Sequence, residues 1–191
     1  MDKKITYFEK PGGDENTDKT LALAKTRADE LGIKTVIVAT TEGKTGVKAV
    51  NVFKGFKVIA VTHVEGFMEP NSQELTPENR KVIEDGKGII LTAAHAFGGL
   101  QRALVNTRPI PPSQAMGDII AMTYRTFGQG MKVACEIAAM AADAGLVKVD
   151  EEVVSIGGTG RGADTAIVIK PNYTHRFFDT RVKEIICKPR M

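Results

Sequence analysis

The segment best suited to chemistry is a glycine-rich loop inside residues 155–170 (SIGGTGRGADTAIVIK). Four of the six positions from 157 to 162 are glycine, which leaves backbone amides uncovered by side chains. Successive amides in tight turns form a concave anion site, and an arginine holds phosphate through two parallel hydrogen bonds. The loop therefore predicts a phosphate site, with a ligand-free hairpin as the alternative. The candidate ligand residues are Gly158, Thr159, Gly160, Arg161 and Gly162.

A second polar loop, residues 40–46 (TTEGKTG), follows an apolar run at residues 35–40. The run (TVIVAT) is continuous and β-branched, which is typical of a strand covered on both faces in a parallel sheet. The loop is expected to lead into a short helix at residues 47–53, whose first backbone amides would favour an anion. The chain therefore offers two separate places for a negatively charged group.

His63 and His95 are the candidates for acid–base chemistry or metal binding, because neutral imidazole binds metals and titrates near neutral pH. Two histidines without a third ligand do not define a metal site, so no metal is predicted. Hydrogen bonding to a ligand or to the backbone is the alternative role. Cys135 and Cys187 lie in apolar surroundings without metal-type spacing and are expected to be buried free thiols.

Two short motifs match nucleotide-binding patterns only in part. Gly158, Gly160 and Ala163 fit the permissive form of a dinucleotide fingerprint, but the residues that follow (TAIVIK) have a strand pattern where the fingerprint requires a helix. Residues 43–45 (GKT) resemble the end of a Walker A loop, but the glycine required five positions earlier is Val38. The sequence therefore favours phosphate binding without nucleoside triphosphate hydrolysis.

Alternating strands and helices are expected to position these residues. Strands are predicted at residues 4–8, 35–40, 57–61, 88–91, 153–156, 165–170 and 184–187. Helices are predicted at residues 16–31, 47–53, 76–85, 97–105, 115–124 and 131–144, with an irregular proline-rich loop at residues 106–114. This alternation predicts an α/β fold with an open, mainly parallel sheet and helices on both faces.

Polar residues follow the predicted strands, at the point where each strand ends. They are Glu9, Thr40, Thr41, Thr62, His63, Thr92, His95 and the loop at residues 157–161. Strands that feed helices in this way share an orientation, so their carboxyl ends meet at one edge of the sheet, where open sheets bind ligands. The sequence therefore predicts a ligand site at that edge.

The composition is typical of a globular protein with a single domain, residues 1–191. Charged residues make up 26% and the net charge is only +3, so neither a nucleic-acid nor a membrane partner is indicated. No apolar run is long enough to span a membrane and the amino terminus lacks a secretory signal, so we expect a cytoplasmic protein. The alanine-rich helix at residues 131–144 and the proline-rich loop are candidate contacts of a homo-oligomer.

Two segments resemble the carboxy-terminal α/β domain of pyruvate kinase. Residues 35–46, followed by KVIAVTH, are similar to a strand, a Ser/Thr-Gly-basic-Ser/Thr loop and the next strand of that domain. Residues 151–171 (EEVVSIGGTGRGADTAIVIKP) are similar to its terminal strand, its glycine loop and an antiparallel edge strand. In allosteric pyruvate kinases these loops bind the phosphates of a sugar bisphosphate, and Glu42 stands where the kinase loop usually has a serine. The resemblance implies phosphate-binding roles for Thr40, Thr41, Gly43, Lys44, Thr45 and Gly158 to Gly162.

The whole chain is similar to a family of small stand-alone proteins, mostly archaeal, that are described as pyruvate kinase α/β-domain-like. Shared segments include YFEKPG, THVEGF, GQGMKVACEIAAMAADAG and FDTRVKEIICKPR. This resemblance implies a Rossmann-like sheet and flavin mononucleotide (FMN) as the ligand. The phosphate of FMN would suit the glycine loop, and its ring would lie among Phe67, Phe97, His63 and His95.

The expected function is thus the binding of a phosphorylated small molecule, with FMN as the expected cofactor, at the carboxyl edge of the sheet. Two alternatives stay open. One is a regulatory module that binds a sugar phosphate, and the other is a metabolic enzyme that uses His63 or His95 on a bound metabolite.

Overall fold

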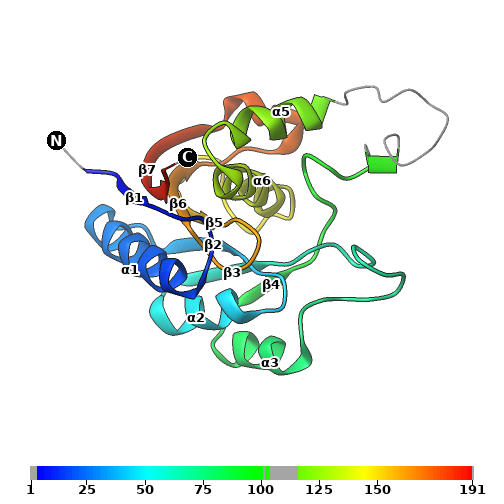
Figure 1. Cartoon of the computed structure of the whole chain (residues 1–191), viewed down its shortest axis with the longest axis horizontal. Helices are drawn as coiled ribbons and strands as arrows, with labels where there is room; N and C mark the ends of the chain where they lie inside the picture. The colour runs from blue at the N-terminus through cyan, green and yellow to red at the C-terminus, as the bar shows by residue number, and fades with distance from the viewer. Residues whose placement is uncertain (1–3, 101, 104–115, 191) are drawn as a thin grey trace.

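In a computed structural model of the protein, which describes residues 4–100, 102–103 and 116–190, one seven-stranded sheet lies between two layers of helices (Figure 1). The strands are β1 (Thr6–Phe8), β2 (Thr35–Ala39), β3 (Lys57–Val61), β4 (Ile89–Leu91), β5 (Val153–Gly157), β6 (Thr165–Lys170) and β7 (Arg181–Pro189). The helices are α1 (Asp14–Leu31), α2 (Lys44–Val52), α3 (Pro77–Asp85), α5 (Met116–Arg125) and α6 (Gln129–Asp143), with a 3-10 helix η1 (Thr174–Asp179).

The sheet is mainly parallel, as the sequence predicts. Its strand order is β1-β7-β6-β5-β2-β3-β4, and neighbouring strands are parallel except at β6, which runs antiparallel to both β5 and β7. The α/β class and the antiparallel strand near the carboxyl terminus are therefore confirmed. The strand that follows the glycine loop does not itself form the border, because β7 and then β1 lie beyond it.

Helices cover both faces of the sheet, and this explains the continuous apolar run in β2. Val36 and Val38 belong to the core shared with α1, α2 and α3, whereas Ile37 belongs to the core shared with α5 and α6. All three side chains are fully buried. Burial of a side chain of this size contributes about 1.5–3 kcal/mol. Figure 1 shows α1 to α3 on one side of the sheet and α5 and α6 on the other.

The helix predicted at residues 97–105 is wrong in its first turn. Residues 96–100 form a turn in which the carbonyl oxygen of His95 accepts hydrogen bonds from the amides of Gly98 (3.3 Å) and Gly99 (2.8 Å). Two successive glycines disfavour a helix because glycine loses the most backbone freedom on folding. Residues 102–103 are helical, while the rest of this predicted helix and the predicted loop at residues 106–114 lie outside the described residues.

Both cysteines are free and buried, as expected: Cys135 lies on α6 and Cys187 on β7. Burial raises the pKa of Cys135 to about 12 and that of Cys187 to about 11. The thiolate is the reactive form of cysteine, so neither thiol is suited to nucleophilic chemistry near neutral pH.

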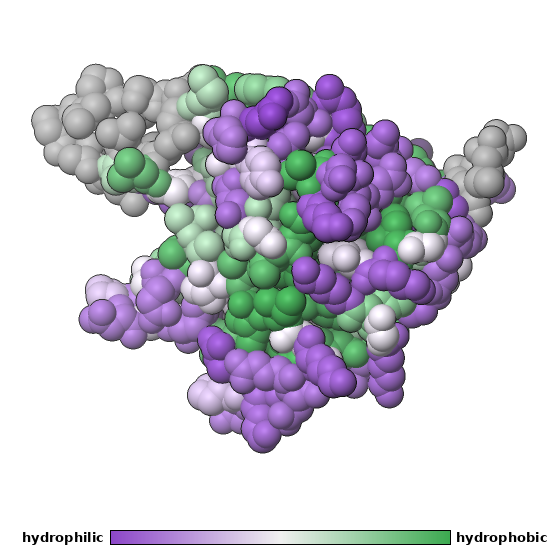
Figure 2. All heavy atoms as spheres, turned by 180° about the vertical axis from the view of Figure 1, so that it is seen from behind, coloured by the Kyte–Doolittle hydropathy of each residue, from purple (hydrophilic) through white to green (hydrophobic). Residues whose placement is uncertain are grey.

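None of the described helices combines the length and the hydropathy that crossing a membrane requires. Seen from behind, part of the surface nevertheless exposes hydrophobic side chains among hydrophilic ones (Figure 2). Exposed hydrophobic residues on α5 and η1 are Met116, Ile119, Met122 and Phe178. The homo-oligomer expected from the sequence stays a prediction.

Candidate functional site

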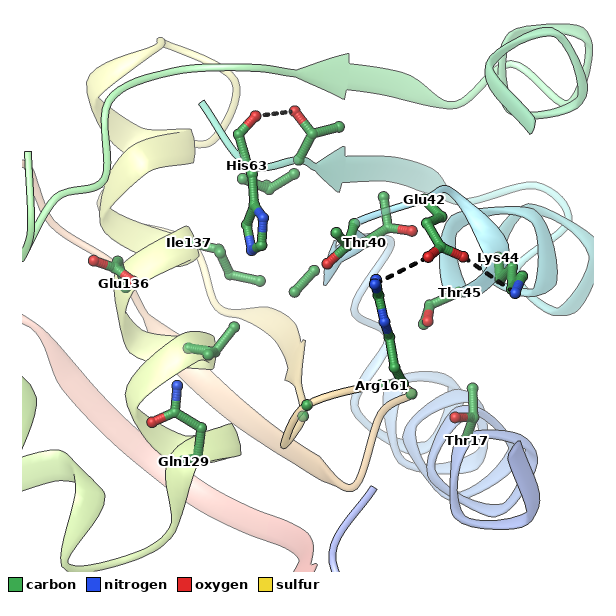
Figure 3. A pocket seen from close by; sticks show the side chains of 18 of the residues that line it. Thr17, Thr40, Glu42, Lys44, Thr45, His63, Gln129, Glu136, Ile137 and Arg161 are labelled. Carbon is green, nitrogen blue, oxygen red and sulfur yellow. Dashed lines mark hydrogen bonds and ion pairs between the residues drawn. The ribbon is translucent and has the colours of Figure 1, made fainter. Parts of the chain in front are cut away.

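A cleft of about 520 Å³ lies at the carboxyl ends of β2, β3 and β5, the edge at which the sequence predicts a ligand. The loops that follow β2 and β5 form one wall, and α6 forms the other. Figure 3 shows Arg161 and Glu42 on the loop side, Gln129 and Glu136 on the α6 side, and His63 between them.

The loop after β2 is held from behind by α3. The amide nitrogen of Asn79 is capped by Thr76 (3.2 Å) at the start of α3, and the Asn79 side chain donates to the carbonyl oxygen of Glu42 (2.8 Å). Gly43 has a φ of 105°, and a Cβ atom there would lie only 2.4 Å from the Cβ of Asn79. Only glycine fits both the backbone and the space. α2 starts at Lys44, before the predicted position 47. Its N-cap Gly43 has no side chain, and the amide of Gly46 donates to the hydroxyl of Thr40 (3.2 Å), so of the first amides those of Lys44 and Thr45 are left for a ligand at this edge.

The glycine loop after β5 is held by the start of α1. The amide of Gly13 donates to the carbonyl oxygen of Arg161 (2.9 Å), and the amide of Ala163 donates to the hydroxyl of Thr17 (2.8 Å). Asp164 is fully buried and accepts hydrogen bonds from the amide of Gly12 (2.9 Å) and from the hydroxyl of Thr165 (2.7 Å). Asp164 therefore stiffens the loop through the backbone.

An ion pair joins the two loops across the mouth of the cleft. Arg161 Nη2 lies 3.0 Å from one carboxylate oxygen of Glu42, and Lys44 Nζ lies 3.1 Å from the other (Figure 3). The hydrogen bond from Lys44 and the charge of Arg161 lower the pKa of Glu42. A carboxylate of the protein thus holds the two cations that the sequence assigns to phosphate.

The opposite wall contains a buried ion pair. Lys132 and Glu136, one turn apart on α6, are hydrogen bonded to each other, and the backbone amide of Phe97 donates to the other Glu136 oxygen (3.0 Å). Both side chains are almost fully buried, at 7% and 5% exposed. Burial lowers the pKa of Lys132, and the charge of Glu136 opposes this shift.

The two strand-exit histidines lie close together, with ring centroids 5.6 Å apart. His63 Nδ1 lies 2.6 Å from a carboxylate oxygen of Glu74, and the His63 ring packs against Phe67 at 4.2 Å. A carboxylate at Nδ1 favours the tautomer that keeps the proton there, which leaves Nε2 as an acceptor. Burial lowers the pKa of His95 to about 4, so His95 is neutral near pH 7.

The cleft brings together most of the residues predicted from the sequence. Those that line it are Thr40, Thr41, Lys44, Thr45, His63, His95, Gly158, Gly160, Arg161 and Gly162. Gly43 belongs to the first loop but packs against Asn79 of α3. The hydroxyl of Thr159 is buried and has no hydrogen-bond partner among the described residues.

Phe97 does not line the cleft. It is 4% exposed, and its ring packs edge-on against Phe177 (5.0 Å between centroids) and stacks with Tyr124 (6.2 Å) in the core beneath α6. The prediction that its ring faces a ligand is therefore not supported by its position. Phe97 lies in the turn at residues 96–100. There its backbone amide donates to Glu136, while its side chain faces the core.

Sequence reasoning missed most of the α6 wall and the partner of His63. The residues concerned are Glu74, Arg102, Arg125, Gln129, Lys132 and Glu136. A signal was present in the alanine-rich segment MKVACEIAAMAADA, where a lysine and a glutamate stand four positions apart in an otherwise apolar helix. No group of three or more His, Cys, Asp and Glu in the described part of the chain is arranged to hold a metal ion.

Residues 18–169 match the family described as pyruvate kinase, alpha/beta domain. The matched range contains both loops of the cleft and all of α6. Among solved structures, the crystal structure of O-ureido-L-serine synthase is similar over 56% of this chain at 19% sequence identity, with a TM-score of 0.31. This chain covers only 29% of that protein.

Proposed function

The chain belongs to the pyruvate kinase alpha/beta domain family, and from the geometry of its cleft we propose that it binds a phosphorylated small molecule at the carboxyl edge of the sheet. The observation that carries the proposal is the meeting of the two loops across the cleft. Arg161 of one loop lies 3.0 Å from Glu42 of the other loop. The two loops are therefore close enough for a single phosphate to contact both of them. The ligand sites of open α/β sheets lie at this edge.

The charge of the cleft supports an anionic ligand. Its lining contains six cationic side chains, Lys44, Lys48, Arg102, Arg125, Lys132 and Arg161, against three carboxylates, Asp14, Glu42 and Glu136. Backbone amides at the start of α2 and in the glycine loop add partial positive charge. A phosphate ester would gain from both contributions.

We propose FMN as this ligand. A volume of about 520 Å³ is within the range of small-molecule sites. The rings of His63, Phe67 and His95 lie within 6 Å of one another and line the cleft beyond the phosphate loops, where a flat ring would pack. Phe97 takes no part in this ring site because it lies in the core. We also propose that the protein is cytoplasmic and that neither a nucleic acid nor a membrane is its partner.

The test is a comparison of FMN with riboflavin, which differs only by the phosphate. The purified protein should take up FMN, with visible flavin absorption, and calorimetry should give tighter binding of FMN than of riboflavin. Arg161→Ala should weaken FMN binding by about 1.5–3 kcal/mol and leave riboflavin binding unchanged, because the lost bond is charge-assisted. Arg176→Ala removes an arginine of similar exposure on η1, outside the cleft, and serves as the control.

Two results would count against the proposal. A colourless protein that binds neither flavin excludes FMN, and equal affinities for FMN and riboflavin exclude the phosphate site. A sugar phosphate that raises the melting temperature more than FMN does at the same concentration would favour the regulatory module, since stabilisation by a ligand follows its affinity.

The pair formed by His63 and Glu74 favours proton transfer as a second candidate function. The carboxylate holds Nδ1 at 2.6 Å, so Nε2 is available as a base toward a molecule in the cleft. An enzyme of this kind would transfer deuterium from solvent into a bound metabolite, and His63→Asn would abolish that exchange. Exchange that is unchanged in the variant would remove His63 from this role.

A further inference from the structure

Three cations gather at the α6 wall of the cleft, near the amino terminus of α6. Arg102 follows the turn after β4, Arg125 is the last residue of α5, and Lys132 lies in the first turns of α6. All three line the same cleft as the phosphate loops. After burial, the positive charges of Arg125 and Arg102 also lower the pKa of Lys132, so the three groups are close enough to repel one another. Three separate segments therefore bring positive charge to one place.

This charge is poorly compensated within the protein. Glu136 is the carboxylate at this wall, and its two oxygens are already bound by Lys132 and by the amide of Phe97. Arg125 donates from Nε to the neutral side-chain oxygen of Gln129 (2.7 Å). Arg102 lies over the Phe67 ring, 4.9 Å from its centroid. In the part of the chain that the structure describes, neither guanidinium forms an ion pair with a carboxylate.

The segment that carries these cations is itself poor in acidic residues. Residues 92–136 contain four basic residues, Arg102, Arg108, Arg125 and Lys132, and two acidic residues, Asp118 and Glu136. Asp118 lies in the first turn of α5, whereas Arg125 lies at its end. Seven residues of helix separate them, which is about 10 Å along the axis.

The start of α6 adds to the same field. The N-cap residue of α6 is Gly128, which has no side-chain cap, and there is no acidic residue in the first turn. A helix amino terminus carries partial positive charge, so it stabilises an anion and disfavours nearby cations. Arg125 and Lys132 nevertheless flank this terminus. Like charges that converge on one wall of a cleft are destabilising unless an anion joins them.

We propose that this end of the cleft is a second anion-binding subsite, formed by Arg102, Arg125 and Lys132. The inference rests on the proposed phosphate site at the two loops and not on FMN as its ligand, because Arg102 lies over Phe67 and a second anionic group here would take the place of the flavin ring. The preferred ligand carries its phosphate at the loops and a second anionic group, a carboxylate or another phosphate, at its other end. Arg125 and Arg102 are the adaptable part of the subsite, and the buried Lys132 is the fixed part.

The experiment uses a matched pair of probes, 6-phosphogluconate and sorbitol 6-phosphate. Both have the same carbon chain and phosphate, and they differ by a carboxylate in place of a hydroxymethyl group. Calorimetry on the whole protein at low salt should show that 6-phosphogluconate binds at least about tenfold more tightly, the effect of one charge-assisted hydrogen bond. A second pair, 3-phosphoglycerate and glycerol 3-phosphate, extends the test to a shorter separation of the charges.

Variants assign the preference to the subsite. Arg125→Gln and Arg102→Gln should each reduce the ratio of affinities within the pair, and the double variant should bring it close to one. Both positions are exposed, so the fold is expected to persist. Arg176→Gln, on η1 outside the cleft, should leave the ratio unchanged.

The outcomes separate the two proposals. Equal binding within both pairs, or a preference that persists in the double variant, overturns the second subsite while the phosphate site stands. Sorbitol 6-phosphate that binds no better than sorbitol overturns the phosphate site itself. A preference for the carboxylate that vanishes in the double variant supports the subsite.

Discussion

The two walls of the cleft differ in how far their ion pairs are exposed to solvent. On the loop wall, Arg161 and Lys44 hold Glu42 with side chains that are 68% and 76% exposed. On the α6 wall, Lys132 and Glu136 pair with side chains that are almost fully buried. Water screens the first set of charges, so those ion pairs contribute little to stability, whereas a buried pair is costly to break. The loop wall is therefore able to exchange its partners for a ligand, while the α6 wall is a fixed part of the fold.

The sharpest test of this contrast is to break the buried pair. Lys132→Met leaves the Glu136 carboxylate buried without its cation, and we expect the free energy of unfolding to fall by about 3–5 kcal/mol in urea titrations. The double variant K132M/E136Q should recover most of this loss. Its glutamine removes the charge and keeps an oxygen for the amide of Phe97, which lies 3.0 Å from Glu136 in the native protein.

An exposed pair with the same spacing provides the control. Lys81 and Asp85 on α3 are also four residues apart, with side chains that are 74% and 64% exposed. Lys81→Met should leave the urea midpoint almost unchanged because water solvates the remaining carboxylate. A loss in Lys81→Met as large as that in Lys132→Met would contradict the distinction between the two walls.

The loop wall depends on backbone shape, which glycine variants test. A Cβ atom at Gly158 would lie 1.9 Å from the carbonyl oxygen of Gly162, so Gly158→Ala must displace the backbone and should cost about 3 kcal/mol. Gly160 has a φ of 66° with open space around it, so Gly160→Ala should cost about 1 kcal/mol from backbone strain alone. Phosphate affinity should fall in the first variant and persist in the second. Equal losses in the two variants would show that the close packing of this loop is unimportant.

The partly buried His95, which follows β4, should make stability depend on pH. Unfolded His95 takes up a proton below its ordinary pKa near 6.5, whereas folded His95 stays neutral down to about pH 4. The unfolded state therefore binds more protons in this window, and stability falls as the pH falls from 6.5 toward 4. At pH 5 the loss should be about 1–2 kcal/mol relative to pH 7.

Urea titrations of His95→Gln at both pH values would isolate this contribution. The variant should lose less stability than the native protein over the same interval, because glutamine does not titrate. His175→Gln, at an exposed position on η1, should follow the native curve. An unchanged pH dependence in His95→Gln would place the origin of the effect elsewhere.

The smallest expected effect concerns Glu42, which occupies the cations of the loop wall. Because a phosphate must displace its carboxylate from Arg161 and Lys44, Glu42→Gln should raise the affinity for inorganic phosphate by about three- to tenfold. The increase should shrink at high salt, as exposed charges are screened. A weaker affinity in this variant would mean that Glu42 positions Arg161 for the ligand instead of competing with it.

The loop wall was largely predictable from the sequence because its information is local. Gly158, Gly160 and Gly162 stand close together in the chain, directly after an apolar strand pattern, which predicts a loop with exposed backbone amides. The edge on which it lies also follows from the alternation of strands and helices. The structure places it opposite Lys44 and Thr45, as the resemblance to pyruvate kinase implies.

The α6 wall was not predictable in the same way. An apolar helix such as MKVACEIAAMAADA indicates burial, and burial alone does not say that Lys132 and Glu136 meet a cleft. The position of Phe97 was unpredictable for a related reason: an aromatic residue after a strand faces either the cleft or the core, and the structure places this ring in the core. Glu74 reaches His63 from a loop eleven positions away, and no periodic pattern marks that contact.

The sequence by itself determined the class of fold and the gathering of the glycine loop and the strand-exit residues at one edge of the sheet. These depend on hydrophobic periodicity and on the backbone freedom of glycine, which are properties of short stretches of chain. Only the tertiary structure decided which charges share the cleft, which of them are buried, and that Glu42 already neutralises Arg161. Electrostatic interactions depend on distance and solvent access between residues far apart in the chain, and only the folded structure fixes those two quantities.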